Sequence, residues 1–94
     1  MVEPPRILRR FADLPEGQMH YREAGRDLSG TPLLLLHQAS GGSRTMALLM
    51  RVIGAHRPVI APDLPGNGDS DPMQTPKPAM ADYAAECARF LDLL

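Results

Sequence analysis

Four consecutive leucines, Leu33 to Leu36, form an unbroken apolar run. A run of this length is too short for a helix and favours a β-strand. A strand that is apolar at every position is typical of α/β proteins, in which helices cover both faces of a sheet. We therefore expect both faces of this strand to be buried.

A helix and a second short strand are predicted after the leucine run. Ser43 is suited to the N-cap position, and Gly54 is a natural stop signal. Between them, apolar residues recur at i, i+3, i+4 and i+7, as Met46, Leu49, Met50 and Ile53. The segment 58–61 is then a short apolar strand. A strand, a helix and a strand in this order form a βαβ unit, which predicts that segments 33–36 and 59–61 are parallel neighbours.

The N-terminal part predicts an antiparallel hairpin. Segment 7–11 suits a strand, residues 14–17 suit a type I turn, and segment 18–24 alternates well enough for a second strand. The alternation directs two side chains inward, Met19 and Tyr21, and three outward, Gln18, His20 and Arg22.

A long loop and a final helix are predicted for the remainder of the chain. Residues 63–78 are rich in proline and glycine, which is typical of a loop with many turns. Apolar residues then recur at helical spacing, as Met80, Tyr83, Cys87, Phe90 and Leu94, while Asp82, Glu86 and Arg89 fall elsewhere. Because the pattern meets no stop signal, we expect the natural polypeptide to continue.

Composition excludes several classes of protein. Ten basic and 11 acidic residues give a net charge of -1, which lacks the positive surface that nucleic-acid or anionic-membrane binding needs. No stretch approaches the roughly 20 apolar residues of a membrane span. A single cysteine excludes a disulfide framework and favours a cytoplasmic location. We expect one domain, residues 1–94, which is marginal in size for independent stability.

Two segments carry a resemblance to a known family. Leu33 to Ala39 is an apolar strand followed by His37-Gln38-Ala39, and Pro62 to Ser70 reads PDLPGNGDS. Together they resemble the start of an α/β-hydrolase. The resemblance covers nearly the whole chain but only the N-terminal third or so of that family. It implies a partial α/β-hydrolase fold, with a mixed sheet of about four strands (the hairpin plus the βαβ unit) and helices on both faces.

The resemblance also implies roles for three residues. The backbone N–H of Ala39 matches a position that donates to the oxyanion. Gln38 stands where the family more usually has glycine, and its side chain could line the substrate pocket. His37 borders the same pocket, and we expect its ring to bond loop backbone, because the family's catalytic histidine lies far downstream. None of the four serines, Ser29, Ser40, Ser43 and Ser70, lies in a G-x-S-x-G motif, so the triad is expected outside this chain.

Other sites in the chain have weaker signals. Gly66 and Gly68 could suggest a nucleotide-binding module, but no third glycine and no helix follow directly. Asp63, Asp69 and Asp71 could suggest a cation site, but their spacing lacks the calcium-loop pattern. We expect the two glycines to adopt unusual backbone conformations, and Asp63 and Ser70 to satisfy backbone donors. Cys87 is expected to be a buried, inert thiol, and neither His20 nor His56 has the spacing of a metal ligand.

Two functions from different classes remain open. One is the N-terminal part of a hydrolase that acts on an ester or related carbon centre, with a small-molecule substrate once completed and with no cofactor. The other is a non-catalytic interaction or assembly subunit. The resemblance places a further strand beside segment 33–36, which leaves that edge unpaired in this chain. We therefore expect self-association, a complementary chain, or origin from a longer chain by cleavage. No nucleic acid and no membrane are expected as partners.

Overall fold

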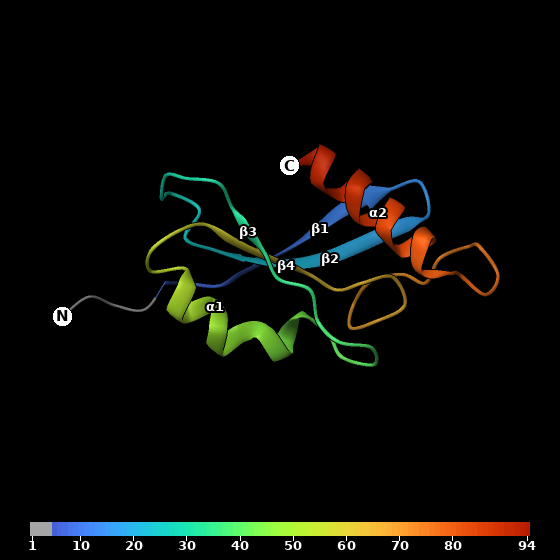
Figure 1. Ribbon diagram of the computed structural model, residues 1–94, viewed down its shortest axis with the longest axis horizontal. Helices are drawn as coiled ribbons and strands as arrows, with labels where there is room; N and C mark the ends of the chain where they lie inside the picture. The colour runs from blue at the N-terminus through green and yellow to red at the C-terminus, as the bar shows by residue number, and fades with distance from the viewer. Residues whose placement is uncertain (1–4) are drawn as a thin grey trace.

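Four strands form one mixed sheet in the computed structural model, which describes residues 5–94 (Figure 1). Along the chain the elements are β1 (Leu8–Leu14), β2 (Gly17–Ala24), β3 (Leu33–Leu34), the 3-10 helix η1 (Ser43–Met46), α1 (Ala47–Ile53), β4 (Val59–Pro62) and α2 (Met80–Leu93). The strand order is β1-β2-β4-β3. β2 is antiparallel to both β1 and β4, whereas β3 and β4 are parallel. The hairpin, the parallel pair and the α/β class are confirmed.

The leucine run is less buried than expected. Leu33 and Leu35 pack against the α1 side of the sheet, but both remain half-buried, and Leu36 is 51% exposed. β3 is the outer strand of the sheet, with β4 beside it and no strand of the described residues on its other side. The expectation that both faces of this strand are buried is therefore wrong. An apolar sequence does not show whether the chain also supplies the helices or strands that would cover it.

The two helices cover opposite faces of the sheet, as expected (Figure 1). On one face, Met50 of α1 packs with Ala24, Val59 and Ala61. Leu49, predicted to be a core residue, is about half exposed, and its neighbours Leu48 and Val52 are 75% and 61% exposed. The buried stripe of this seven-residue helix is therefore narrower than its periodicity predicted. The helix ends before Gly54, as expected.

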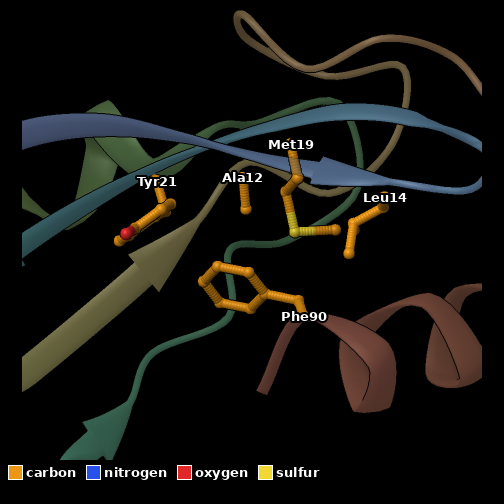
Figure 2. Close-up of a cluster of buried hydrophobic side chains, with 5 residues drawn as sticks. All are labelled: Ala12, Leu14, Met19, Tyr21 and Phe90. Carbon is orange, nitrogen blue, oxygen red and sulfur yellow. The ribbon is translucent and has the colours of Figure 1, made fainter. Parts of the chain in front are cut away.

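The opposite face carries a separate apolar cluster, made by Ala12, Leu14, Met19, Tyr21 and Phe90 (Figure 2). The Phe90 ring meets the Tyr21 ring edge-on, with centroids 4.9 Å apart. Met80, expected on the buried side of the helix, is 83% exposed. α2 is about 21 Å long, whereas two strands span roughly 10 Å, so the ends of a helix that crosses them extend past the packed face.

Two polar residues are buried against expectation. His20 lies on the predicted face of β2, but that face is not solvated: the loop after β4 covers it, and the Phe11 ring lies 5.0 Å from the imidazole. Glu86 is buried because it lies four residues before Phe90 and shares its side of α2, where it pairs with Arg89. None of the helices within residues 5–94 has the length and apolarity to cross a membrane.

Replacing Phe90 by alanine tests the second cluster. Phe90 is fully buried, so Phe90→Ala should lower the free energy of unfolding by about 3 to 5 kcal/mol in urea titrations. Leu93→Ala, on an exposed position of the same helix, should cost less than about 1 kcal/mol. Equal losses from both variants would show that α2 does not anchor the fold through Phe90.

Candidate active site

The loops that follow β3 and β4 lie together at one edge of the sheet. Because the two strands are parallel, their carboxyl ends meet at the same edge, which is where ligands bind in open α/β sheets. A direct hydrogen bond joins the loops: the backbone N–H of Leu64 donates to Nε2 of His37 over 3.0 Å. In Figure 1 both segments leave the sheet on the same side.

Both ring nitrogens of His37 are engaged with loop backbone. Nε2 accepts from Leu64, and Nδ1 lies 2.7 Å from the carbonyl oxygen of Gln38, to which it donates. This pair of bonds requires the neutral ring with its proton on Nδ1. The ring is buried. The expectation that the His37 ring bonds loop backbone is therefore confirmed. Neither ring nitrogen is free for proton transfer.

A tight turn presents Ala39 at the surface. The N–H of Gly41 donates to the carbonyl of Gln38 over 3.0 Å, and Ser40 between them has a φ of 66°. The positive φ therefore falls on Ser40 and not on Gln38, so glutamine is accommodated there without backbone strain. Gln38 and Ala39 are both exposed. Within residues 5–94, no hydrogen bond occupies the N–H of Ala39.

Asp63 is the main polar connection behind this turn. Its side chain is 1% exposed, and its carboxylate accepts three hydrogen bonds. The Ser43 N–H donates to Oδ1 over 2.5 Å, while the Asp69 N–H (3.0 Å) and Nδ1 of His20 (2.8 Å) donate to Oδ2. One side chain thus connects β2, the start of η1 and the loop after β4.

Ser70 and Gly68 complete this arrangement. The Ser70 hydroxyl donates to the carbonyl of Asp63 over 2.6 Å and accepts from the N–H of His20 over 2.8 Å. Gly68 has a φ of 51°, and a Cβ at this position would overlap the Asp63 carboxylate. The expected roles of Asp63 and Ser70 as partners of backbone donors are confirmed, as is the unusual backbone of Gly66 and Gly68.

Ser43 is not the N-cap that the sequence predicted. The residue before η1 is Gly42, whose backbone is extended and whose position has no side-chain cap. The Ser43 hydroxyl instead accepts a hydrogen bond from Arg22, and its N–H is taken by Asp63. A carboxylate from another part of the chain thus satisfies a donor at the start of this helix, which local sequence patterns cannot reveal.

The pKa of Asp63 reflects two opposed effects. Burial, the largest single effect, raises the pKa because it disfavours the charged carboxylate. The hydrogen bonds from Asp69, Ser43 and His20 together outweigh burial and lower the pKa to about 2. Asp63 is therefore an anion at neutral pH, and it acts as a fixed acceptor.

The weakly indicated cation site and the thiol that was expected to be inert both lack the geometry of a reactive site. Asp63 and Asp69 gather with His20 and not with Asp71, which accepts from the N–H of Gln18. Since the Asp63 oxygens already hold three N–H groups, a cation there would have to displace them. Cys87 is half-buried, and burial, aided by the nearby Glu86 charge, raises the pKa of its thiol.

His20 and Arg22 are site residues that the sequence did not indicate. Alternation placed them on one face of β2, but it could not show that a distant loop covers that face. The strand register could have indicated that this face is buried. Phe11 lies directly opposite His20, and such an aromatic pair is favourable when the face is covered.

The lowered pKa of Asp63 predicts acid sensitivity. A folded-state pKa of about 2, below the usual value of about 4, gives stability that is complete above pH 4 and is lost as the pH falls toward 2. Urea titrations from pH 5 to pH 2 should show the free energy of unfolding falling across this window. Asp63→Asn should lower stability at pH 5 and flatten the decline. An unchanged decline would mean that other carboxyls cause it.

Comparison with known proteins identifies the architecture. No protein-family model matches the chain. A proline iminopeptidase of Heyndrickxia coagulans is 31% identical over 85 residues, which cover 89% of this chain and 30% of that protein. The Cif epoxide hydrolase from Acinetobacter nosocomialis superposes with a TM-score of 0.84 at 23% identity, over 94% of this chain and 27% of that one.

The N-acyl homoserine lactonase AidH superposes with a TM-score of 0.82 at 29% identity, over 92% of this chain and 32% of that one. The chain thus spans about a third or less of the length of the proteins it matches. These neighbours are α/β-hydrolase fold proteins. The four-stranded mixed sheet with a helix on each face is therefore the N-terminal portion of the α/β-hydrolase fold, and this chain carries it.

Proposed function

We propose that the chain is the N-terminal part of a hydrolase that acts on an ester or related carbon centre, with a catalytic triad lying outside this chain. The observation that carries the proposal is the turn at Ala39: its N–H has no partner within residues 5–94 and lies at the carboxyl ends of two parallel strands. An unpaired donor at this edge of the sheet is suited to receive developing negative charge.

The proposed reaction divides its tasks between this chain and the rest of the fold. A nucleophile outside the chain attacks the electrophilic carbon, and the electron pair of the C=O bond moves onto oxygen. The Ala39 N–H donates a hydrogen bond to that oxyanion. Asp63 and His37 act only as positioning residues, since their polar atoms already hold loop backbone.

Several reactions at a carbon centre fit this proposal. The names of the similar proteins include a peptidase, an epoxide hydrolase and a lactonase, which share nucleophilic attack at carbon but differ in the bond cleaved. Gln38 is exposed beside Ala39, and we propose that it contacts the substrate, with His37 behind it. We propose no cofactor, and the single cysteine favours a cytoplasmic location.

An assembly role is the second candidate, and the open side of the sheet favours it. β3 is an outer strand, and Leu36 on that strand's continuation and Leu48 and Val52 on α1 are exposed apolar residues. A chain of this kind would serve as a non-catalytic subunit that completes another protein. Intact mass and a search for a co-purifying second chain separate the two candidates.

Replacing Ala39 by proline tests the oxyanion role. In a protein that also carries the remaining elements of the fold, Ala39→Pro deletes the N–H and should lower kcat by about 10² to 10³, as for loss of one oxyanion donor. Ala39→Gly keeps the N–H and should retain most activity. If the folded proline variant keeps kcat within about threefold, Ala39 is only a turn residue.

The open edge of β3 predicts association. An unpaired strand edge beside exposed leucine favours pairing with a second copy or a complementary chain. Light scattering on the chain should show species larger than a monomer, and Leu36→Lys should weaken association by about tenfold or more. Met80→Lys, at an exposed site on α2, is the matched control and should have little effect. A stable monomer at high concentration would refute this prediction.

A further inference from the structure

An open hollow of about 510 Å³ lies against the β1–β2 hairpin and the start of η1. Ala39 is not among its lining residues, although Asp63, which supports the turn at Ala39, also lines the hollow. Three arginines line it, together with two glycines and two acids: Arg9, Arg22, Arg44, Gly42, Gly68, Asp63 and Asp69. The arginines come from three different elements, so the fold alone brings them together.

Two of these arginines form an unfavourable pair. Arg9 of β1 lies directly opposite Arg22 of β2, on the same face of the hairpin. Like charges directly opposite in an antiparallel pair destabilise a sheet. Arg44 adds a third positive charge to the same hollow.

The carboxylates near these arginines do not neutralise their positive charge. Within residues 5–94, Arg10, Arg26 and Arg89 have glutamate partners, whereas Arg9, Arg22 and Arg44 have none. Asp63 lines the hollow, but its oxygens are occupied by three N–H groups. Asp69 is the remaining acid, and its N–H rather than its carboxylate takes part in that network. The hollow therefore has more positive than negative charge.

We propose that this hollow binds a phosphoryl group, either as free phosphate or as a phosphate monoester. Guanidinium groups bind phosphate oxygens through paired N–H donors, and several oxygens on one phosphorus atom can serve arginines from different directions. A bound dianion would also relieve the repulsion between Arg9 and Arg22. The volume leaves space for an organic group beyond the phosphate.

Calorimetric titration at constant ionic strength tests the proposal. The probes are inorganic phosphate, phenyl phosphate and, as the carboxylate control, benzoate. We expect saturable binding of phosphate below about 10 mM and weaker binding of benzoate. Tighter binding of phenyl phosphate identifies a monoester as the ligand, and equal affinities identify free phosphate. No saturable phosphate binding, or benzoate binding as tight as phosphate, would overturn the proposal.

Charge variants assign the binding to this hollow. Arg9→Met and Arg44→Met should each weaken phosphate binding about tenfold, and Asp69→Asn should tighten it, because it removes the opposing charge. Arg51→Met removes an exposed arginine outside the hollow and should leave affinity within about twofold. Equal losses from Arg51→Met and Arg9→Met would show only non-specific attraction.

Thermal unfolding gives a readout independent of affinity. Without phosphate, Arg9→Gln should raise Tm by roughly 1 to 4 °C, since it removes the repulsion with Arg22. With phosphate, the order should reverse, because only the unmodified hollow gains the ligand's stabilisation. A Tm of Arg9→Gln that stays above that of the unmodified protein at saturating phosphate would contradict the proposal.

Discussion

The buried carboxylate of Asp63 is the interaction on which the rest of the site depends. Taking a carboxylate out of water is unfavourable unless hydrogen bonds compensate for the lost hydration. Three N–H groups, from His20, Ser43 and Asp69, provide that compensation. Each donor lies on a different part of the chain, so the carboxylate can be satisfied only when β2, η1 and the loop after β4 are all in place.

A second connection completes the support for the turn at Ala39. Asp63 holds Ser43, which lies four residues after Ala39, and His37 holds Leu64 from two residues before it. The turn is therefore fixed at both ends to the loop after β4. Groups that stabilise charge in a transition state act best when they are already held in position. Two buried polar connections on either side of a short exposed turn meet that requirement.

Sequence patterns predicted the hairpin, the parallel strand pair and the glycine-rich loop, because alternation, helical periodicity and glycine all act locally. They could not predict contacts made by residues far apart in the chain. Alternation predicts that His20 faces solvent, because it reports a face of the strand and not what covers that face. The sequence predicts a local cap at Ser43, but the N–H of Ser43 donates to Asp63, which lies 20 residues away. The spacing of Glu86 and Phe90 did hold usable information, since residues four apart share one side of a helix.

The two sides of the sheet differ in how completely the chain buries them. On the α2 side, the five buried side chains of the cluster, Phe90 among them, come from the hairpin and one helix, and half-buried Ile60 of β4 packs against them. On the α1 side, four buried residues are surrounded by half-buried ones, Leu33 and Leu35 among them, and β3 has an open edge. The hairpin with α2 thus supplies its own packing, whereas the β3–α1 half, which carries the turn at Ala39, gains most from further contacts. The proposed chemistry therefore lies on the less completely buried side of the sheet, where added contacts would both stabilise the fold and fix the turn.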